Sequence, residues 1–181
     1  FYICEFRASE AFEMQRLQRH LISSLANLSV PCLGGRGVRV LDINLYDVSI
    51  KLLQAREGSR EGSRLWDELI AVETDVEKDN LLELLQNVLG VEDYLIPAIG
   101  ERLQQTDFDV LFLSGIGEVF PYIRSHNVLN NLQSTAKDKP TVLFFPGEYR
   151  HSLEQGASLE LFGLLHDDKY YRAFNIFETQ V

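Results

Sequence analysis

The chain has 181 residues, of which 45% are hydrophobic, and its 17 basic and 27 acidic side chains give a net charge of −10. The length is that of one domain, and the composition is that of an ordinary globular protein, which excludes wholesale disorder. The acidic excess argues against electrostatic binding to duplex DNA. No run of about 18 or more apolar residues occurs, so the sequence predicts no membrane-spanning helix.

Strand and helix patterns alternate along the chain and predict a single α/β domain over residues 1–181. The expected strands are short and rich in bulky apolar residues; they cover 1–6, 38–43, 110–113, 141–145 and about 170–177. The expected helices repeat apolar residues at helical spacing; they cover about 9–28, 46–55, 65–72, 78–89, 92–105, 125–136 and 158–165. Strands separated by helices need crossovers, so we expect a three-layer sandwich with a mostly parallel sheet of about five strands.

Three local signals refine these elements. The chain opens at Phe1 without a methionine or a basic leader, which indicates a piece of a longer polypeptide rather than a signal peptide. Ser9 is the expected cap of the first helix, and Pro97 should either kink helix 92–105 or move its start to about residue 96. The tetrad Arg-Glu-Gly-Ser occurs twice in succession and predicts a flexible surface loop at about 56–64.

The two cysteines, Cys4 and Cys32, are too few for a disulfide framework, so a reducing, cytoplasmic location is expected. The acidic excess is concentrated in residues 67–93, which hold nine acids and one base, Lys78. A solvated helix face and a docking surface for a basic partner both explain this charge, and the sequence leaves the two open.

Familiar catalytic and cofactor motifs are missing from the sequence. No phosphate-binding G-x-x-x-x-G-K-[ST] occurs, and the glycines of residues 34–37 precede a strand instead of joining a strand to a helix. The cysteines and histidines lack zinc-ligand spacing, and no G-x-S-x-G elbow is present. We therefore expect no metal ion, no cofactor and no assignable catalytic residue.

The loops expected after strands 110–113 and 141–145 are the most chemically interesting, because parallel sheets place their sites at the carboxyl ends of strands. They should gather charged and imidazole side chains along one rim: Glu118, Arg124, His126, Glu148, Arg150 and His151. A glutamate beside a histidine can perform general acid–base catalysis, while arginine and tyrosine often dominate protein interfaces. Catalysis, binding and plain loop structure all remain open for this rim.

Residues 110–129 (VLFLSGIGEVFPYIRSHNVL) and 140–149 (PTVLFFPGEY), followed by LFG at 161–163 and YYRAF at 170–174, resemble the BrxB family of bacterial BREX phage-exclusion systems. BREX systems mark host DNA by adenine methylation and block replication of unmarked phage DNA. The resemblance implies partners: PglZ first, and also the methyltransferase PglX and the ATPase BrxC. It implies no catalytic residues, because none are established for the family.

The resemblance favours a non-catalytic adaptor that docks PglZ through Arg124, Glu148, Tyr149 and Arg150. The alternative is a nucleotide-dependent or hydrolytic enzyme that uses Glu118, His126 and His151. The run from Val110 to Phe145 is similar to the middle of a P-loop ATPase core, but it lacks the phosphate loop, so it predicts at most a degenerate P-loop-like core.

Overall fold

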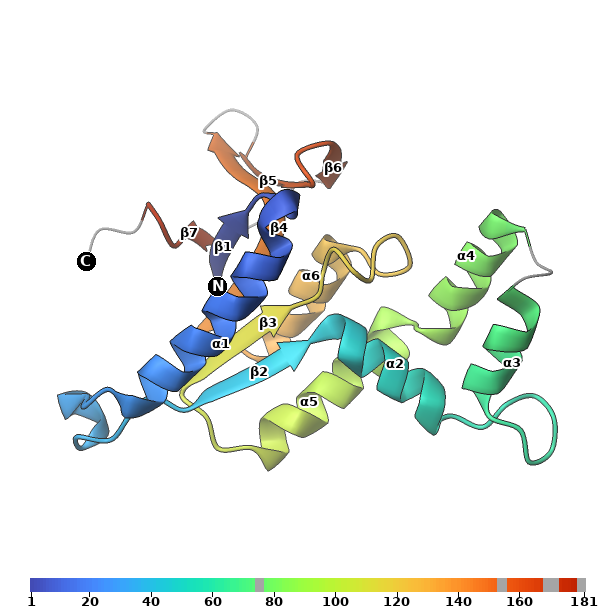
Figure 1. Ribbon diagram of the computed structural model, residues 1–181, viewed down its shortest axis with the longest axis horizontal. Helices are drawn as coiled ribbons and strands as arrows, with labels where there is room; N and C mark the ends of the chain where they lie inside the picture. The colour runs from blue at the N-terminus through green and yellow to red at the C-terminus, as the bar shows by residue number, and fades with distance from the viewer. Residues whose placement is uncertain (74–76, 153–155, 168–172, 179–181) are drawn as a thin grey trace.

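Seven strands form the sheet framework of the computed structural model, which describes residues 1–73, 77–152, 156–167 and 173–178 (Figure 1). Five of them lie side by side in the order β2-β3-β4-β1-β7, and each adjacent pair is parallel. The strands are β1 (Tyr2–Phe6), β2 (Val40–Asn44), β3 (Val110–Ser114), β4 (Thr141–Ser152), β5 (Gly156–Leu161), β6 (Leu165–Asp167) and β7 (Phe174–Asn175). The predicted parallel sheet of about five strands is confirmed.

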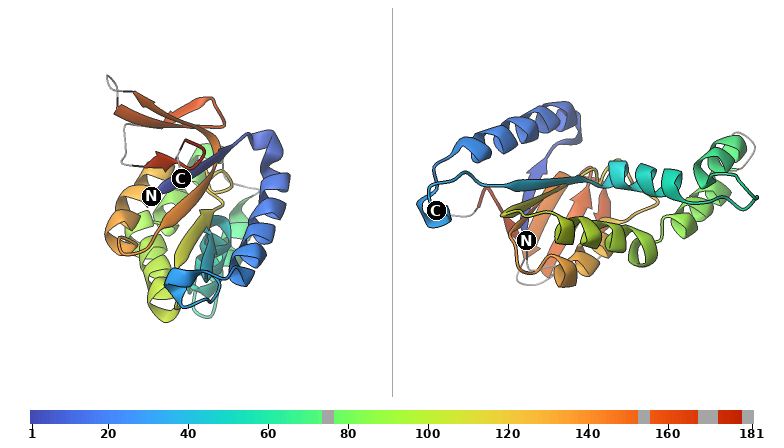
Figure 2. Two further views of the ribbon diagram at one scale, coloured as in Figure 1. Left: turned by 90° about the vertical axis from the view of Figure 1, so that its left-hand side faces the viewer. Right: turned by 90° about the horizontal axis from the view of Figure 1, so that it is seen from below.

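Helices cover both faces of this sheet, as Figure 2 shows in its left-hand view, so the three-layer prediction is also confirmed. Helix α1 packs on one face, and α5 and α6 pack on the other. The helices are α1 (Ala11–Asn27), α2 (Leu45–Ala55), α3 (Leu65–Glu73), α4 (Lys78–Val88), α5 (Ile96–Gln105) and α6 (Ser125–Thr135). Short turns of 3-10 helix (Ala8–Glu10, Pro31–Leu33) and π helix (Val91–Leu95) complete the set.

The two faces of the sheet have separate hydrophobic cores because successive side chains of a strand point to opposite sides. On β3, Leu111 and Leu113 are fully buried in the larger core, whereas Phe112 faces α1 in the smaller one. Cys4 belongs to the smaller core, where burial and the neighbouring Glu5 carboxylate raise the pKa of its thiol to about 11. The apolar run Val110–Leu113 of β3 is thus explained by burial on both faces, as predicted.

Most helices lie where their spacing predicts, with boundaries displaced by a few residues. Pro97 sits in the first turn of α5, which begins at Ile96, so the second alternative for that proline is confirmed. Ser9 lies inside a 3-10 turn, and Glu10 takes the N-cap position of α1. Of the expected strand at 170–177, the structure shows Phe174–Asn175, and residues 170–172 lie outside the described residues. In the described ranges, no helix has the length and apolar character needed to cross a bilayer.

The predicted helix at 158–165 is wrong, and so is the loop expected after residue 145. Strand β4 continues to Ser152 and pairs antiparallel with β5, which in turn pairs with β6. Close approach of the strands requires Gly147, because a Cβ there would lie 2.1 Å from the Glu160 carbonyl oxygen. A tight turn follows β5, with positive φ at Phe162 (59°) and Gly163 (68°). The apolar residues near 160 therefore alternate along a strand instead of repeating on a helix.

The repeated Arg-Glu-Gly-Ser loop is fastened to the start of α3 by Glu68. The Glu68 carboxylate accepts hydrogen bonds from Ser63 Oγ at 2.5 Å, Ser59 Oγ at 2.7 Å and the Ser59 backbone N at 2.9 Å. These bonds, led by the one from Ser63, lower the pKa of Glu68 to about 2. Its two serines thus hold the loop on the helix that follows it.

A charged cluster joins the chain before β2 to the residue before β3. Arg36 donates to the Asp109 carboxylate at 2.5 and 2.8 Å, and Arg39 donates to it from its backbone N at 2.8 Å and from Nη2 at 3.1 Å. Hydrogen bonds from the two arginine side chains are the main reason that the pKa of Asp109 lies well below its ordinary value. The cluster fixes the register at which β2 and β3 begin.

Replacing Asp109 by asparagine should flatten the acid limb of the stability profile. Because the folded state depresses the pKa of Asp109, its stabilisation is fully present above its unfolded pKa of about 4 and is lost as the pH falls below that value. In urea unfolding, the difference between the wild type and Asp109→Asn should therefore be largest near neutral pH and shrink in acid. Asp107→Asn is the matched control, since Asp107 also contacts Arg39 but its side chain is 76% exposed. A difference that does not change with pH would contradict the assignment.

Candidate functional site

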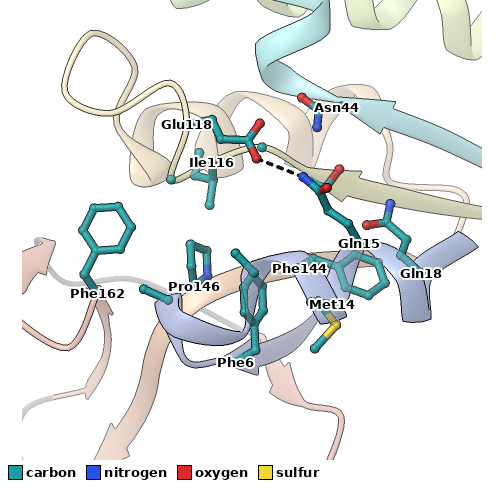
Figure 3. Close-up of a pocket in the computed structure, with 15 residues that line it drawn as sticks. Phe6, Met14, Gln15, Gln18, Asn44, Ile116, Glu118, Phe144, Pro146 and Phe162 are labelled. Atoms are coloured by element: carbon teal, nitrogen blue, oxygen red, sulfur yellow. Dashed lines mark hydrogen bonds between the residues drawn. The ribbon is translucent and has the colours of Figure 1, made fainter.

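A pocket opens at the carboxyl ends of the parallel strands, the edge where open α/β sheets place their ligands (Figure 3). It has a volume of about 190 Å³ and lies between α1, the β3–α6 connection and the base of the β4–β5 hairpin. Its lining is mostly apolar: Phe6, Ala8, Ala11, Met14, Ile116, Phe144, Pro146 and Phe162, with Gln15, Gln18, Asn44, Glu118 and residues 114, 115 and 117. We call this the strand-end pocket.

Two turns at the strand-end pocket, the one after β2 and the one after β3, pack closely against each other. Asn44 ends β2 and caps α2, its Oδ1 accepting hydrogen bonds from the backbone N of Tyr46 at 2.8 Å and of Asp47 at 3.2 Å. Gly115 follows β3 with a φ of 81°, and a Cβ at that position would lie 2.4 Å from Asn44 Oδ1. The glycine is therefore required both by its backbone conformation and by the cap beside it.

Gly115→Ala should destabilise the fold by about 2 kcal/mol. About half of this comes from a positive φ and about half from displacing the Asn44 cap. Gly34→Ala is the matched control: Gly34 has a φ of 70°, but its added Cβ would meet nothing within 4 Å. Gly34→Ala should therefore cost about 1 kcal/mol or less, measured by thermal or urea unfolding. Equal losses for the two variants would show that Asn44 tolerates the methyl group.

Two glutamines that line the strand-end pocket, Gln15 and Gln18, each donate a hydrogen bond to an acidic side chain. Gln15 Nε2 donates to Glu118 Oε1 at 3.4 Å, as the dashed line in Figure 3 marks. Gln18 is buried and donates to Asp42 Oδ1 at 2.6 Å. Desolvation raises the pKa of Asp42, and the hydrogen bond from Gln18 opposes this rise; more than a third of the Asp42 residue is still exposed to solvent. Glu118 is the single ionisable group among the lining residues, so they include no acid–base pair.

The junction of β1 and α1 is the place where a P-loop protein would hold phosphate. Here the junction runs from Arg7 to Glu10 and contains neither glycine nor lysine. Ala8 and Ala11, at and just after the junction, line the strand-end pocket. The backbone amides and lysine that recognise nucleotide phosphates are therefore not provided at this junction.

The structure separates the residues expected along the rim. Glu118 lines the strand-end pocket, whereas Arg124 is exposed in a different, polar groove beside Glu92 and Asp93. His126 is half-buried in the first turn of α6 and is not among the residues that line the strand-end pocket. The proposed grouping of Glu118 with His126 is not formed around one cavity of the described residues.

Glu148, Arg150 and His151 lie on the β4–β5 hairpin instead of on a loop. Arg150 donates to Glu148 Oε2 from Nη2 at 2.8 Å, and its Nε lies 3.6 Å from Glu160 Oε1 across the hairpin. The salt bridges explain Arg150 structurally, although its side chain stays 64% exposed. His151 pairs with Ala157 in the strand register. A binding role for Arg124, Glu148 and Arg150 stays a prediction.

Tyr149 is buried, with 9% of the residue exposed, so the expectation that it faces a partner on a loop does not fit its position. Its Oη donates to the Ala173 carbonyl at 2.8 Å, and its backbone N donates to Glu5 Oε2 at 2.8 Å. Asn175 Nδ2 donates to the other carboxylate oxygen of Glu5 at 2.9 Å. Burial raises the pKa of the Tyr149 hydroxyl. Sequence reasoning missed this network, whose signal is the charged Glu5 inside an apolar strand.

A second concave surface lies between α2, α3 and α4. These helices follow the strand-end edge of the sheet, and α3 and α4 project outward from it (Figure 1). We call this concave surface the helical groove. It is lined by Tyr46, Ser49, Ile50 and Leu53 of α2, Trp66, Leu69, Ile70 and Glu73 of α3, Leu81, Leu85 and the following Leu89 of α4, and Val119 and Tyr122. Sequence reasoning found the apolar face of α4 but did not show that the face borders a groove.

Metal binding finds no support in the side-chain arrangement. Across the part of the chain that the structure describes, no three histidine, cysteine, aspartate or glutamate side chains come together as metal ligands do. The two cysteines are both unpaired thiols; Cys4 is buried and Cys32 is exposed.

Comparison with known proteins finds one family. The family model described as BREX protein BrxB matches residues 41–176. A BREX protein BrxB from Bacillus cereus (strain H3081.97) is 33% identical over 144 residues, which cover 78% of this chain and 68% of that protein. A BREX protein BrxB from Escherichia coli O9:H4 (strain HS) is 27% identical over 134 residues, 74% of this chain and 60% of that protein. No solved structure matches.

Proposed function

The chain belongs to the BrxB family of BREX proteins, and from this premise we propose that it is a non-catalytic adaptor in a BREX phage-defence complex. It holds PglZ, and with it PglX or BrxC, in one cytoplasmic assembly that marks host DNA and excludes phage. Family membership supports the involvement in phage defence, and the surfaces of the chain support the adaptor role.

The observation that carries this proposal is the contrast between the two concave surfaces. The strand-end pocket, where an α/β enzyme would place its reacting groups, is lined by one ionisable side chain, Glu118. The helical groove instead presents an apolar lining, and two of its three helices, α3 and α4, lie largely within the acidic stretch 67–93. An apolar surface bordered mainly by acidic side chains suits recognition of another protein.

Pairwise co-purification tests the adaptor role. The chain is co-expressed with PglZ, PglX or BrxC, one at a time, and captured through a tag. We expect PglZ to be retained at a fixed stoichiometry after size-exclusion chromatography. Retention of none of the three would overturn the proposal.

Calorimetry with ATP separates the adaptor from the enzyme alternative. If the chain is an adaptor, we expect no binding of ATP at micromolar concentrations, because the β1–α1 junction lacks a phosphate loop. Micromolar affinity for ATP that Glu118→Gln abolishes would favour a nucleotide-dependent enzyme, since Glu118 is the ionisable group of the strand-end pocket.

The net charge of −10 also leads us to expect no direct binding to duplex DNA near physiological salt.

A further inference from the structure

We propose that the helical groove is the docking site for a basic amphipathic helix of the protein partner. This inference rests on the proposed adaptor function and deepens it, because it names the surface used and the chemistry of what binds there. It also assigns a role to the acidic stretch 67–93, for which the sequence alone left two explanations open.

The groove exposes apolar side chains that a folded chain would otherwise cover. Ile70 of α3 is 50% exposed, and Tyr46 of α2 is 44% exposed. Behind them, Leu53, Leu69 and Leu89 are buried and form a firm floor. Apolar residues at the surface of a rigid concavity gain free energy when a partner covers them.

The size of the groove favours side chains of a helix over a free small molecule. Its volume is about 210 Å³. Pockets for drug-sized ligands are larger, at roughly 300–1,000 Å³, whereas an amphipathic helix inserts a few apolar anchors one turn apart into a shallow groove. The three walls of the helical groove are themselves helices, so neighbouring turns along them offer successive contact points.

The charge around the groove selects a basic partner. Glu73 lies in the lining, and Asp67 and Asp47 each stand three residues before a lining isoleucine, Ile70 or Ile50, on the same helix face. Lys51 and Lys78 are the two bases on these three helices, against six acids: Asp47, Asp67, Glu68, Glu73, Asp79 and Glu83. Lysine or arginine flanking the apolar anchors would therefore be attracted, and an acidic helix would be repelled.

A second copy of the chain is a poorer occupant on the same grounds. Each copy carries a net charge of −10, so two copies repel one another as they approach. The partner we propose is accordingly a different protein with a basic helix.

Two substitutions at one position separate the apolar contribution from the charge. Both Ile70→Lys and Ile70→Glu remove the apolar contact from a half-exposed site, so neither should unfold the chain. If the partner helix is basic, the two effects should differ, because the new lysine repels it and the new glutamate attracts it. Ile70→Lys should weaken binding to the captured partner at least tenfold, and Ile70→Glu should weaken it less. Ile176→Lys, at a residue 40% exposed outside the groove, is the matched control and should change the affinity less than twofold.

Affinity is measured by biolayer interferometry with the full chain and the component retained in the co-purification. Unchanged affinity for both Ile70 variants would contradict docking in the helical groove and leave the adaptor role intact. Failure of the wild-type chain to retain any component would contradict both proposals. A larger loss for Ile70→Glu than for Ile70→Lys would overturn the basic partner.

A photo-reactive amino acid placed at position 70 identifies the occupant directly. Mass spectrometry of the cross-linked complex should find a partner segment with apolar residues at helical spacing and lysine or arginine beside them. A cross-link to a second copy of this chain, or to an acidic segment, would overturn the proposal.

Discussion

Phe145→Ala should cost about 3–5 kcal/mol of unfolding free energy, which is the range for removing a buried aromatic side chain. Phe145 is fully buried on the central strand β4, in the larger core. Its ring also packs where β4 leaves the parallel sheet, since a Cβ on Gly147 would lie 2.7 Å from Phe145 Cε1. The substitution therefore opens a cavity at the point that supports the hairpin, and the midpoint of urea unfolding should fall steeply.

Phe12→Ala provides the control for this prediction. The same atoms are removed, but Phe12 is 68% exposed on α1, so its loss should stay within about 0.5 kcal/mol. A similar cost for the two phenylalanine variants would mean that position 145 is not the packed site described here.

Glu5→Ala should destabilise the chain by about 2–4 kcal/mol, because it removes the carboxylate that accepts hydrogen bonds from the Tyr149 backbone N and from Asn175 Nδ2. Glu5→Gln should cost less, since one oxygen remains, but it should not restore wild-type stability because its amide nitrogen cannot accept. Hydrogen exchange at the amides of β7 should speed up in both variants.

Glu13→Ala is the control for the Glu5 variants. The Glu13 side chain is 71% exposed and pairs with Arg16 on the surface of α1, so its loss should be small. Unaltered exchange in β7 on substitution of Glu5 would show that the network does not hold the last strand.

The sequence predicts best where one physical requirement decides the outcome. The apolar run Val110–Leu113 needs burial on both faces, and a central parallel strand is the simple way to provide it. Pro97 can occupy the first turn of a helix but not its interior, so α5 begins at Ile96. Glu118 was expected beyond the carboxyl end of β3, because parallel sheets place their sites at that edge, and it lines the strand-end pocket there.

Elements that depend on a distant partner were harder to predict. Leu161, Phe162, Leu164 and Leu165 have helical spacing, whereas Leu159 and Leu161 alternate as on a strand. The antiparallel pairing with β4 decides for the strand. Tyr149 was expected on a loop, because β4 extends past Pro146 only through its pairing with β5, which is a tertiary contact. The helical groove combines side chains from three helices and a loop, so it exists only once these elements have packed.

The strand order also constrains how the chain comes to fold. Strand β1 lies between β4 and β7, and Tyr2 pairs with Val142 and with Phe174, so its partners are more than a hundred residues away in the sequence. During synthesis, β1 leaves the ribosome long before either neighbour exists, and its apolar side chains have no sheet to join. Contacts of such long sequence separation make folding slow, because a large loop must close before any pairing is gained. The nascent chain therefore passes through a stage in which β1 is exposed, and a chaperone that shields residues 1–6 should raise the yield of folded protein.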